Sequence, residues 1–247
     1  MTVLAFREVT KRFRDGLREV AVLDGVSFEL YAGETLGVLA ARGAGKTTLL
    51  RIAAGLEAPD EGEVCWQGRD LARLSADERA RTRRHGGIAL ARCDWRAGDS
   101  KVVVEHVAMP LYAEGLGMGH AEACAWRALE TVQSTELGYT PTGRLGVVER
   151  VRVELARAIA REPALLLIDE PAVLPQPKDA RAFLDLIHSL PKRLDLSLLI
   201  ASEEVAALRG AGPSRSAVRV MSLDNGRLHS TDSRRKVIRL PERRGAA

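Results

Sequence analysis

The chain has 247 residues, of which 46% are hydrophobic and 28% are charged, a composition ordinary for a globular protein with a sizeable core. This length suits one large α/β domain or a core with an inserted subdomain. The formal net charge of +4 is too mild to indicate a nucleic-acid-binding protein, and no apolar run approaches the ~20 residues that a membrane-spanning helix requires.

The hydrophobic pattern of the first third of the chain predicts strands followed by helices. A turn is expected at Asp24 and Gly25, inside the second strand-like segment. In chain order, the predicted elements are strands over 3–8, 19–31 and 34–40, a helix over 47–56, a short strand within 58–72 and a helix over 76–84.

The rest of the chain predicts a helical insertion followed by more strands and helices. Residues 102–133 are rich in Ala, Leu and Glu at helical spacing and show no strand character, so we interpret them as an insertion. The later predicted elements are a helix over 150–162, a strand over 164–168, a helix over 179–190, a strand over 196–201 and a hairpin over 218–230. Alternating strands and helices are typical of a parallel sheet covered on both faces.

The cysteines indicate a reducing environment. Cys65, Cys93 and Cys124 are odd in number, widely spaced and without a CxxC pair, which argues against a disulfide framework or a zinc site. The first residues alternate and carry charges early, so no signal peptide is expected. Any membrane role would therefore come through a partner.

A phosphate-binding loop is predicted at ARGAGK, between a predicted strand and a predicted helix. Gly43 and Gly45 let the backbone wrap closely, so that its N–H groups point at phosphate oxygens, and the helix dipole adds to the attraction. Lys46 is expected to reach the β- and γ-phosphates, Thr47 to offer its hydroxyl to Mg²⁺, and Thr48 to lie against the α-phosphate. The candidate nucleotide-binding residues of the loop are Arg42, Gly43, Ala44, Gly45, Lys46, Thr47 and Thr48.

One position departs from the usual phosphate-loop pattern. Ala40 stands where the pattern begins with glycine, which removes the tolerance of a positive φ. The alternative interpretation is a glycine-rich turn from strand to helix that binds no ligand.

Two carboxylates complement the loop. The apolar run of residues 164–168 predicts a strand buried on both faces, and ligands of α/β sheets lie at the carboxyl ends of such strands. Asp169, which follows directly, is expected to hold Mg²⁺ through its water shell. Glu170 is expected to orient or deprotonate the attacking water.

With these motifs in place, the chain resembles the ATP-binding subunits of ABC transporters over nearly its whole length, from FREVTKRF and VLDGVSFELYAGE to SLDNGRL. The segment VVVEHVAMPLYAEGL resembles the lipoprotein-release, MacB-type and FtsE-type ATPases. The resemblance implies an α/β fold: a P-loop NTPase core with a mostly parallel sheet, an N-terminal antiparallel β subdomain and an inserted α-helical subdomain. Residues 1–232 would form the domain, with the helical subdomain at about 92–150 and a basic tail over 233–247.

The resemblance also implies ATP and Mg²⁺ as cofactors, with Glu170 as the catalytic residue. In this family two domains pack head to tail, and each ATP lies between the phosphate loop of one and the LSGGQ signature of the other. Phe13 occupies the place of the aromatic residue that stacks on adenine. A half-buried strand residue is the alternative interpretation of Phe13.

The signature departs from the family pattern. Alignment back from RVRVELARA places LSGGQ on Leu145, Gly146, Val147, Val148 and Glu149. Gly146 has no hydroxyl to donate to a γ-phosphate, and branched valines obstruct close backbone approach and disfavour positive φ. Loss of one charge-assisted hydrogen bond costs about 1.5–3 kcal/mol, so this face is expected to bind a partner's ATP poorly.

Three further family motifs are degenerate. The expected glutamine falls on Ala91, with Cys93 as a second register, and neither side chain coordinates Mg²⁺ as an amide does. The expected histidine falls at Ser202, which can form a hydrogen bond but supplies no cation. Gln176 stands where the family has an aspartate after the carboxylates.

These features favour the ATP-binding subunit of an ABC-type membrane complex, peripheral on the cytoplasmic face of the cell membrane. Its partners would be an integral membrane permease and a second ABC ATPase subunit, identical or different, with weak or partner-dependent hydrolysis. The first alternative is a non-hydrolysing regulatory or structural module. A soluble ABC protein of DNA repair or translation is a third possibility, but such proteins usually carry tandem domains or long insertions.

The segment over 92–104, RCDWRAGDSKVVV, is expected to face the membrane subunit, because the family docks its coupling helices there. Trp95 is the candidate anchor of that contact. The alternative is a tryptophan packed inside the helical subdomain.

Overall fold

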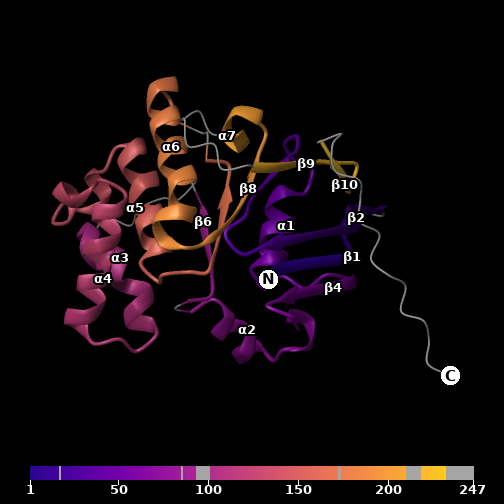
Figure 1. Cartoon of the computed structure of the whole chain (residues 1–247), viewed down its shortest axis with the longest axis horizontal. Coiled ribbons are helices and arrows are strands. Elements are labelled where there is room, and N and C mark those ends of the chain that lie inside the picture. The colour runs from indigo at the N-terminus through magenta and orange to yellow at the C-terminus, as the bar shows by residue number, and fades with distance from the viewer. Residues whose placement is uncertain (17, 85, 93–100, 172–173, 210–217, 232–247) are drawn as a thin grey trace.

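The computed structural model describes the 247-residue chain except for residues 17, 85, 93–100, 172–173, 210–217 and 232–247. The predictions for Cys93, Trp95 and the basic tail over 233–247 lie outside the described residues. The described strands form two sheets, one of four strands and one of six. Helices α3, α4 and α5 gather at one end of the molecule, and strands β1, β2 and β4 lie at the other (Figure 1).

The four-stranded sheet is built at the N-terminus and has the order β2-β1-β4-β5. Its strands are β1 (Thr2–Asp15), β2 (Arg18–Tyr31), β4 (Glu61–Trp66) and β5 (Arg69–Asp70). All of its pairings are antiparallel. The expected N-terminal antiparallel unit is therefore confirmed.

The turn predicted at Asp24 and Gly25 is wrong, because β2 runs through both residues. Val9 pairs with Val26 and Lys11 with Leu23, so between these pairs one residue of β1, Thr10, lies opposite two residues of β2. This extra residue is a β-bulge, and Gly25 accommodates it with a φ of 64°. The Asp-Gly pair serves a bulge here because the two long strands continue to pair on both sides of it.

The six-stranded sheet forms the centre of the fold, in the order β10-β9-β3-β8-β7-β6. Its strands are β3 (Thr35–Leu39), β6 (Ile88–Arg92), β7 (Leu165–Asp169), β8 (Ser197–Ser202), β9 (Val218–Asp224) and β10 (Arg227–Ser230). All neighbours are parallel except β9 and β10, which form the predicted hairpin. Asn225 and Gly226 turn this hairpin with φ of 48° and 76°, as a type I′ turn requires.

Seven α-helices and three short 3₁₀ helices complete the described elements. The α-helices are α1 (Lys46–Ala53), α2 (Ala76–Thr82), α3 (Val103–Ala113), α4 (Met118–Thr131), α5 (Val147–Ile159), α6 (Pro177–Leu194) and α7 (Val205–Arg209). The 3₁₀ helices are η1 (Leu71–Arg73), η2 (Thr135–Leu137) and η3 (Thr142–Arg144). Within the described part of the chain, no helix combines the length and apolarity needed to cross a bilayer.

The central sheet is buried on both faces, which explains its continuous apolar strands. On β7, Leu166 and Ile168 join a core with residues of α3, α4, α5 and α6. Leu165 and Leu167 join the opposite core, with residues of α1 and the antiparallel sheet. Successive side chains of a strand point to opposite faces, so a strand covered on both faces needs apolar residues throughout. The predicted α/β class with a mostly parallel sheet is confirmed.

Candidate functional site

The candidate site lies where three neighbouring parallel strands end. Strands β3, β8 and β7 are adjacent in the sheet, with Leu39 opposite Ser202 and Asp169 opposite Ala201. The segments that follow these strands therefore leave the same edge of the sheet. This edge is where ligands of parallel α/β sheets bind.

The phosphate loop adopts a conformation that requires glycine at one position. Gly45 has a φ of 98°, and a Cβ there would lie 2.7 Å from Val22 Cγ1 and 2.9 Å from the Val22 carbonyl oxygen. Gly43 has a φ of 78°, but a Cβ there would meet nothing within 4 Å. Gly45 therefore lets the loop approach β2 closely, whereas Gly43 supplies only its left-handed turn.

Ala40 fits the loop without strain. It is not one of the residues with a positive φ, so the missing glycine costs no backbone strain. Its N–H donates to the Ser202 carbonyl at 3.1 Å, and its own carbonyl accepts from Lys46 Nζ at 2.8 Å. The departure from the usual pattern is thus compatible with the loop's fold.

Lys46 is buried and contacts several polar groups of the site. Its side chain is only 7% exposed, and Nζ donates to the carbonyl oxygens of Ala40 and Ala41 at 2.8 and 2.9 Å. The same ammonium forms ion pairs with Glu170 Oε1 at 2.9 Å and with Glu203 Oε1 at 3.4 Å. A buried ammonium of this kind is stable only with such partners.

Thr47 and Asp169, the two candidate magnesium ligands, are in direct contact. Thr47 Oγ1 donates to Asp169 Oδ2 at 2.7 Å. A hydroxyl and a carboxylate side by side are oxygen donors of the kind that Mg²⁺ prefers, with phosphates and water completing its shell. Among the described residues, no group of three or more His, Cys, Asp or Glu residues is arranged to hold a metal by itself. The residues therefore fit a magnesium ion that arrives with a phosphate ligand.

Glu170 is held in an unusual backbone conformation by its neighbours. Its φ is 49°, which is rare for a residue with a side chain and is found repeatedly at functional sites. Its N–H donates to the Ala201 carbonyl at 2.9 Å. Its Oε2 accepts from Ser202 Oγ at 3.2 Å and from the Glu203 N–H at 3.3 Å. These bonds, together with Lys46, fix the carboxylate at the strand end.

An open hollow of about 1140 Å³ joins these groups. The predicted site residues that line it are Phe13, Arg42, Gly43, Gly45, Lys46, Thr47, Thr48, Asp169 and Glu170. Phe13 is 43% exposed and belongs to β1, so the hollow extends from the phosphate loop to the antiparallel sheet. Of the other predicted site residues, Ala44 is half-buried in the loop, and Ser202 is fully buried behind Glu170.

Sequence reasoning missed several residues that border the hollow, namely Val22, Leu174, Pro175, Glu203 and Glu204, whereas Val147, which also borders it, was assigned to the signature. The most consequential is Glu203, because it touches Lys46. Glu203 and Glu204 directly follow the end of β8. In the same way, Asp169 and Glu170 lie at the end of β7. Applying the strand-end rule to β8 as well as β7 would have found them.

The region aligned with the signature begins helix α5. Leu145 is buried at 2% exposure, whereas Val147 is 50% exposed at the rim of the hollow. Gly146 is the N-cap with a φ of −68°, and its N–H donates to the Glu149 carboxylate at 2.7 Å. Gly146 thus has an ordinary conformation that other residues can adopt.

Two of the other degenerate positions, Ala91 and Gln176, do not line the hollow. Ala91 is 3% exposed and belongs to the hydrophobic core between the sheet and the helices, so its methyl group does not line the hollow. Gln176 is the N-cap residue of α6 and forms no side-chain cap hydrogen bond.

Comparison with known proteins assigns the family. The family model described as ABC transporter matches residues 23–173. The chain belongs to the ABC transporter family. Two curated members of this family resemble it closely, and both are methionine import ATP-binding proteins named MetN. The protein from Rhizobium johnstonii is 35% identical over 92% of this chain, and the one from Caulobacter vibrioides is 34% identical over 92%. The chain spans only 59% and 65% of the lengths of these two relatives.

Solved ABC structures share the fold. A dimeric, post-hydrolysis structure of the ATP-binding cassette MJ0796, bound to ADP and Pi, superposes with a TM-score of 0.80 at 22% identity. That likeness covers 92% of this chain and 98% of the cassette. A cbiO1 structure from Clostridium perfringens, part of the transporter complex cbiONQ, superposes with a TM-score of 0.77 at 21% identity, covering 92% of this chain and 86% of that one. At these identities the likeness establishes the ABC fold alone.

Proposed function

We propose that this chain is the ATP-binding subunit of an ABC-type membrane transport complex. It couples ATP binding, and hydrolysis that depends on a partner subunit, to movement of a membrane subunit. The observation that carries the proposal is the convergence of Lys46, Thr47, Asp169 and Glu170 at neighbouring strand ends. The import function named for the MetN relatives supports a transport role.

The side chains suggest how the chain would receive Mg·ATP. The loop's N–H groups and Lys46 would bind the phosphates, and Thr47 and Asp169 would hold Mg²⁺, which would neutralise phosphate charge. Lys46 must exchange its contacts with Glu170 and Glu203 for phosphate oxygens. Glu170, once released, accepts a proton from the attacking water, while Ser202 and the Glu203 N–H keep it oriented.

Hydrolysis is proposed to be weak in a homodimer because the signature face is poor. The exposed side chain of Val147 offers no hydrogen bond to a phosphate, and Gly146 has no hydroxyl. In a heterodimer, this chain's phosphate loop would face the intact signature of a second ABC ATPase. Only one of the two shared sites would then turn over ATP.

The proposed complex places the chain at the cytoplasmic face of the cell membrane. An integral membrane permease would be the other partner, contacting the segment over 92–104, much of which lies outside the described residues. We propose no nucleic-acid partner, since the net charge of +4 is mild.

Thermal unfolding and ATPase assays test the proposal together. Mg·ATP or Mg·ADP should raise the melting temperature of the wild-type chain, because ligands that bind only the folded state stabilise it. Lys46→Ala should lose this shift. If neither nucleotide stabilises the wild-type chain, the nucleotide-binding proposal is wrong.

The alternative is a non-hydrolysing regulatory module. The ion pair between Lys46 and Glu170 supports it, because the carboxylate that would activate water is occupied by the lysine. Each group of this pair neutralises the other. The two functions differ in the rate of ATP hydrolysis, which is measured as phosphate release with the candidate partner subunit present. Phosphate release no faster than that of Glu170→Gln would favour the regulatory module, whereas faster release supports the ATPase.

A further inference from the structure

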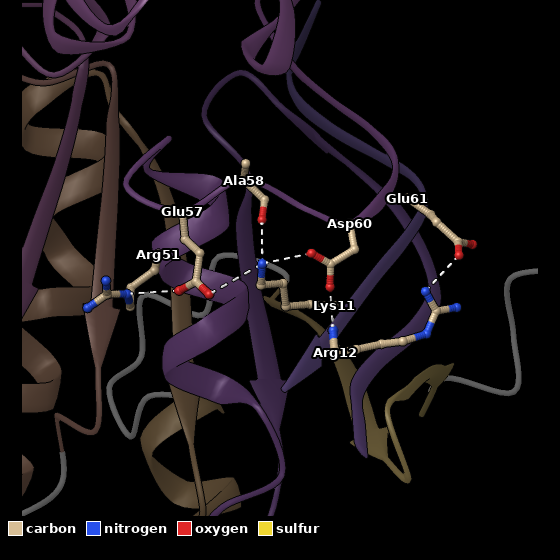
Figure 2. Close-up of polar contacts among 7 residues, drawn as sticks. All are labelled: Lys11, Arg12, Arg51, Glu57, Ala58, Asp60 and Glu61. Carbon is tan, nitrogen blue, oxygen red and sulfur yellow. Dashed lines mark hydrogen bonds and ion pairs between the residues drawn. The ribbon is translucent and has the colours of Figure 1, made fainter. Parts of the chain in front are cut away.

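The ammonium of Lys11 contacts three residues of the segment that joins α1 to β4 (Figure 2). Lys11 Nζ donates to the Ala58 carbonyl and to Asp60 Oδ1, each at 3.0 Å. It also lies 3.8 Å from Glu57 Oε1. The side chain is only 15% exposed although it carries a charge. Such a set of contacts restricts a long, flexible side chain to one position.

This cluster is tied to the helix that begins at the phosphate loop. Glu57, which contacts Lys11, also accepts from Arg51 Nε at 3.1 Å (Figure 2). Arg51 lies in the last turn of α1, whose first residue is Lys46. The Leu56 and Glu57 N–H groups both donate to the Arg51 carbonyl, at 2.9 and 3.3 Å. Glu57 therefore links Lys11 to α1, the helix that begins at the phosphate loop.

The same ammonium lies over the ring of Phe13, 5.6 Å from its centroid. This distance is within the range of cation–π attraction. Phe13 is 43% exposed and lines the same hollow as the phosphate loop.

The side chain of Arg12 belongs to a separate contact and offers a matched comparison. Arg12 Nη1 pairs with Glu61 at 2.7 Å and does not contact Glu57 or Ala58 (Figure 2). Its link to the Lys11 cluster is through the backbone, since the Arg12 N–H donates to Asp60 Oδ2 at 2.7 Å. A side-chain substitution at Arg12 leaves that bond in place.

We propose that Lys11 is a positioning residue for the base of a bound nucleotide. It holds the Phe13 ring at a set place relative to the phosphate loop, through Glu57 and Arg51. The inference rests on the proposed nucleotide-binding function. A ring that is already ordered loses less conformational freedom when a base stacks on it, so binding is stronger. A cation on one face of the ring also withdraws π-electron density, which favours stacking of an electron-rich purine on the other face.

Calorimetric titration of the full chain with two ligands tests this role. Mg·ATP carries a base, whereas Mg·tripolyphosphate presents a phosphate chain without one. Lys11→Met should weaken ATP binding about three- to fivefold, roughly the cost of immobilising one further side chain on binding, and leave tripolyphosphate binding unchanged. Retained tripolyphosphate binding also shows that the variant is folded. Arg12→Met, the matched control, should bind both ligands like the wild type.

A double-mutant cycle separates action through the ring from other effects. Phe13→Leu should weaken ATP binding by itself, and adding Lys11→Met to it should cause no further loss. Equal ATP affinity in Lys11→Met and the wild type would overturn the inference, as would equal weakening of ATP and tripolyphosphate. An additional loss in the double variant would also overturn it. If the wild-type chain binds neither ligand, the proposed function itself fails, and this inference with it.

Discussion

Lys46 Nζ lies 2.9 Å from Glu170 Oε1, although Lys46 begins α1 and Glu170 follows β7, far away in the sequence. The cation expected to bind phosphate and the carboxylate expected to activate water thus neutralise each other in this conformation. A phosphate ligand would have to compete with Glu170 for the same ammonium. Phosphate binding and the release of Glu170 from Lys46 are therefore linked through this one contact.

Replacing Glu170 by Gln should raise the affinity for Mg·ATP and abolish hydrolysis. The amide keeps the shape of the side chain but gives up the charge that pairs with Lys46, so phosphate meets less competition. A change of about tenfold in the dissociation constant is expected, the size of one charge-assisted hydrogen bond. Isothermal titration measures the affinity. An unchanged or weaker affinity would show that the ion pair does not oppose binding.

Alanine substitutions at Gly43 and Gly45 should differ in their effect on stability. Both positions have positive φ, which costs an alanine about 1–2 kcal/mol. At Gly45 the new methyl would also lie 2.9 Å from the Val22 carbonyl oxygen, adding about 1–3 kcal/mol of overpacking. Urea unfolding should therefore rank the chains wild type, Gly43→Ala, Gly45→Ala in decreasing stability. Equal losses in the two variants would contradict the close approach to β2.

The contact between Thr47 and Asp169 predicts that ATP binding depends on Mg²⁺ and that these two residues cause the dependence. Asp169→Asn removes the negative charge that would favour Mg²⁺. We expect ATP to raise the melting temperature of this variant nearly equally with Mg²⁺ and with EDTA, whereas the wild type should depend on Mg²⁺. Thr47→Ser, which keeps the hydroxyl, should behave like the wild type. A full magnesium effect in Asp169→Asn would exclude this carboxylate from metal binding.

Because of His188, the folded chain should be less stable at mildly acidic pH than at neutral pH. Its Nε2 donates to the Ala207 carbonyl at 2.9 Å, joining α6 to α7. Burial lowers the pKa of His188, and this hydrogen bond opposes the shift only in part. The unfolded chain, with a histidine pKa of about 6.5, takes up the proton first as pH falls. The free energy of unfolding should therefore decrease as pH drops through that value.

The control for this pH effect is His188→Gln, whose amide can still donate a hydrogen bond but does not titrate. Its free energy of unfolding, measured between pH 7.5 and 5.5 by urea titration, should depend less on pH than that of the wild type. Identical pH dependence in the two chains would assign the effect to other groups.

Gly146→Ser should be tolerated and should slightly stabilise helix α5. The φ of −68° at Gly146 suits a serine, and a Cβ there meets only Glu149 Oε2, at 3.5 Å. Serine at an N-cap accepts a hydrogen bond from the first turn, which is worth a few tenths of a kcal/mol over glycine. The melting temperature should stay equal or rise by roughly 1–2 °C. A clear fall would show that glycine is needed at this position.

The local elements of this chain could be predicted from the sequence. Apolar runs such as residues 165–168 and 198–200 predict buried strands because burial on both faces leaves no place for polar side chains. The glycines of the phosphate loop and the carboxylates Asp169 and Glu170 are likewise short-range signals. Each depends on only a few neighbouring residues, so periodicity and spacing suffice to find it.

The tertiary structure decided which of these signals meet. The order β3-β8-β7 brings Lys46, Glu170 and Glu203 to one sheet edge, and no local pattern specifies that order. Pairing of β1 with β2 turned the expected Asp24–Gly25 turn into a bulge. The cation of Lys11 over Phe13 depends on a loop some 50 positions later in the chain. Such contacts arise from packing between distant segments, whose geometry is set by the whole fold and not by the residues on either side.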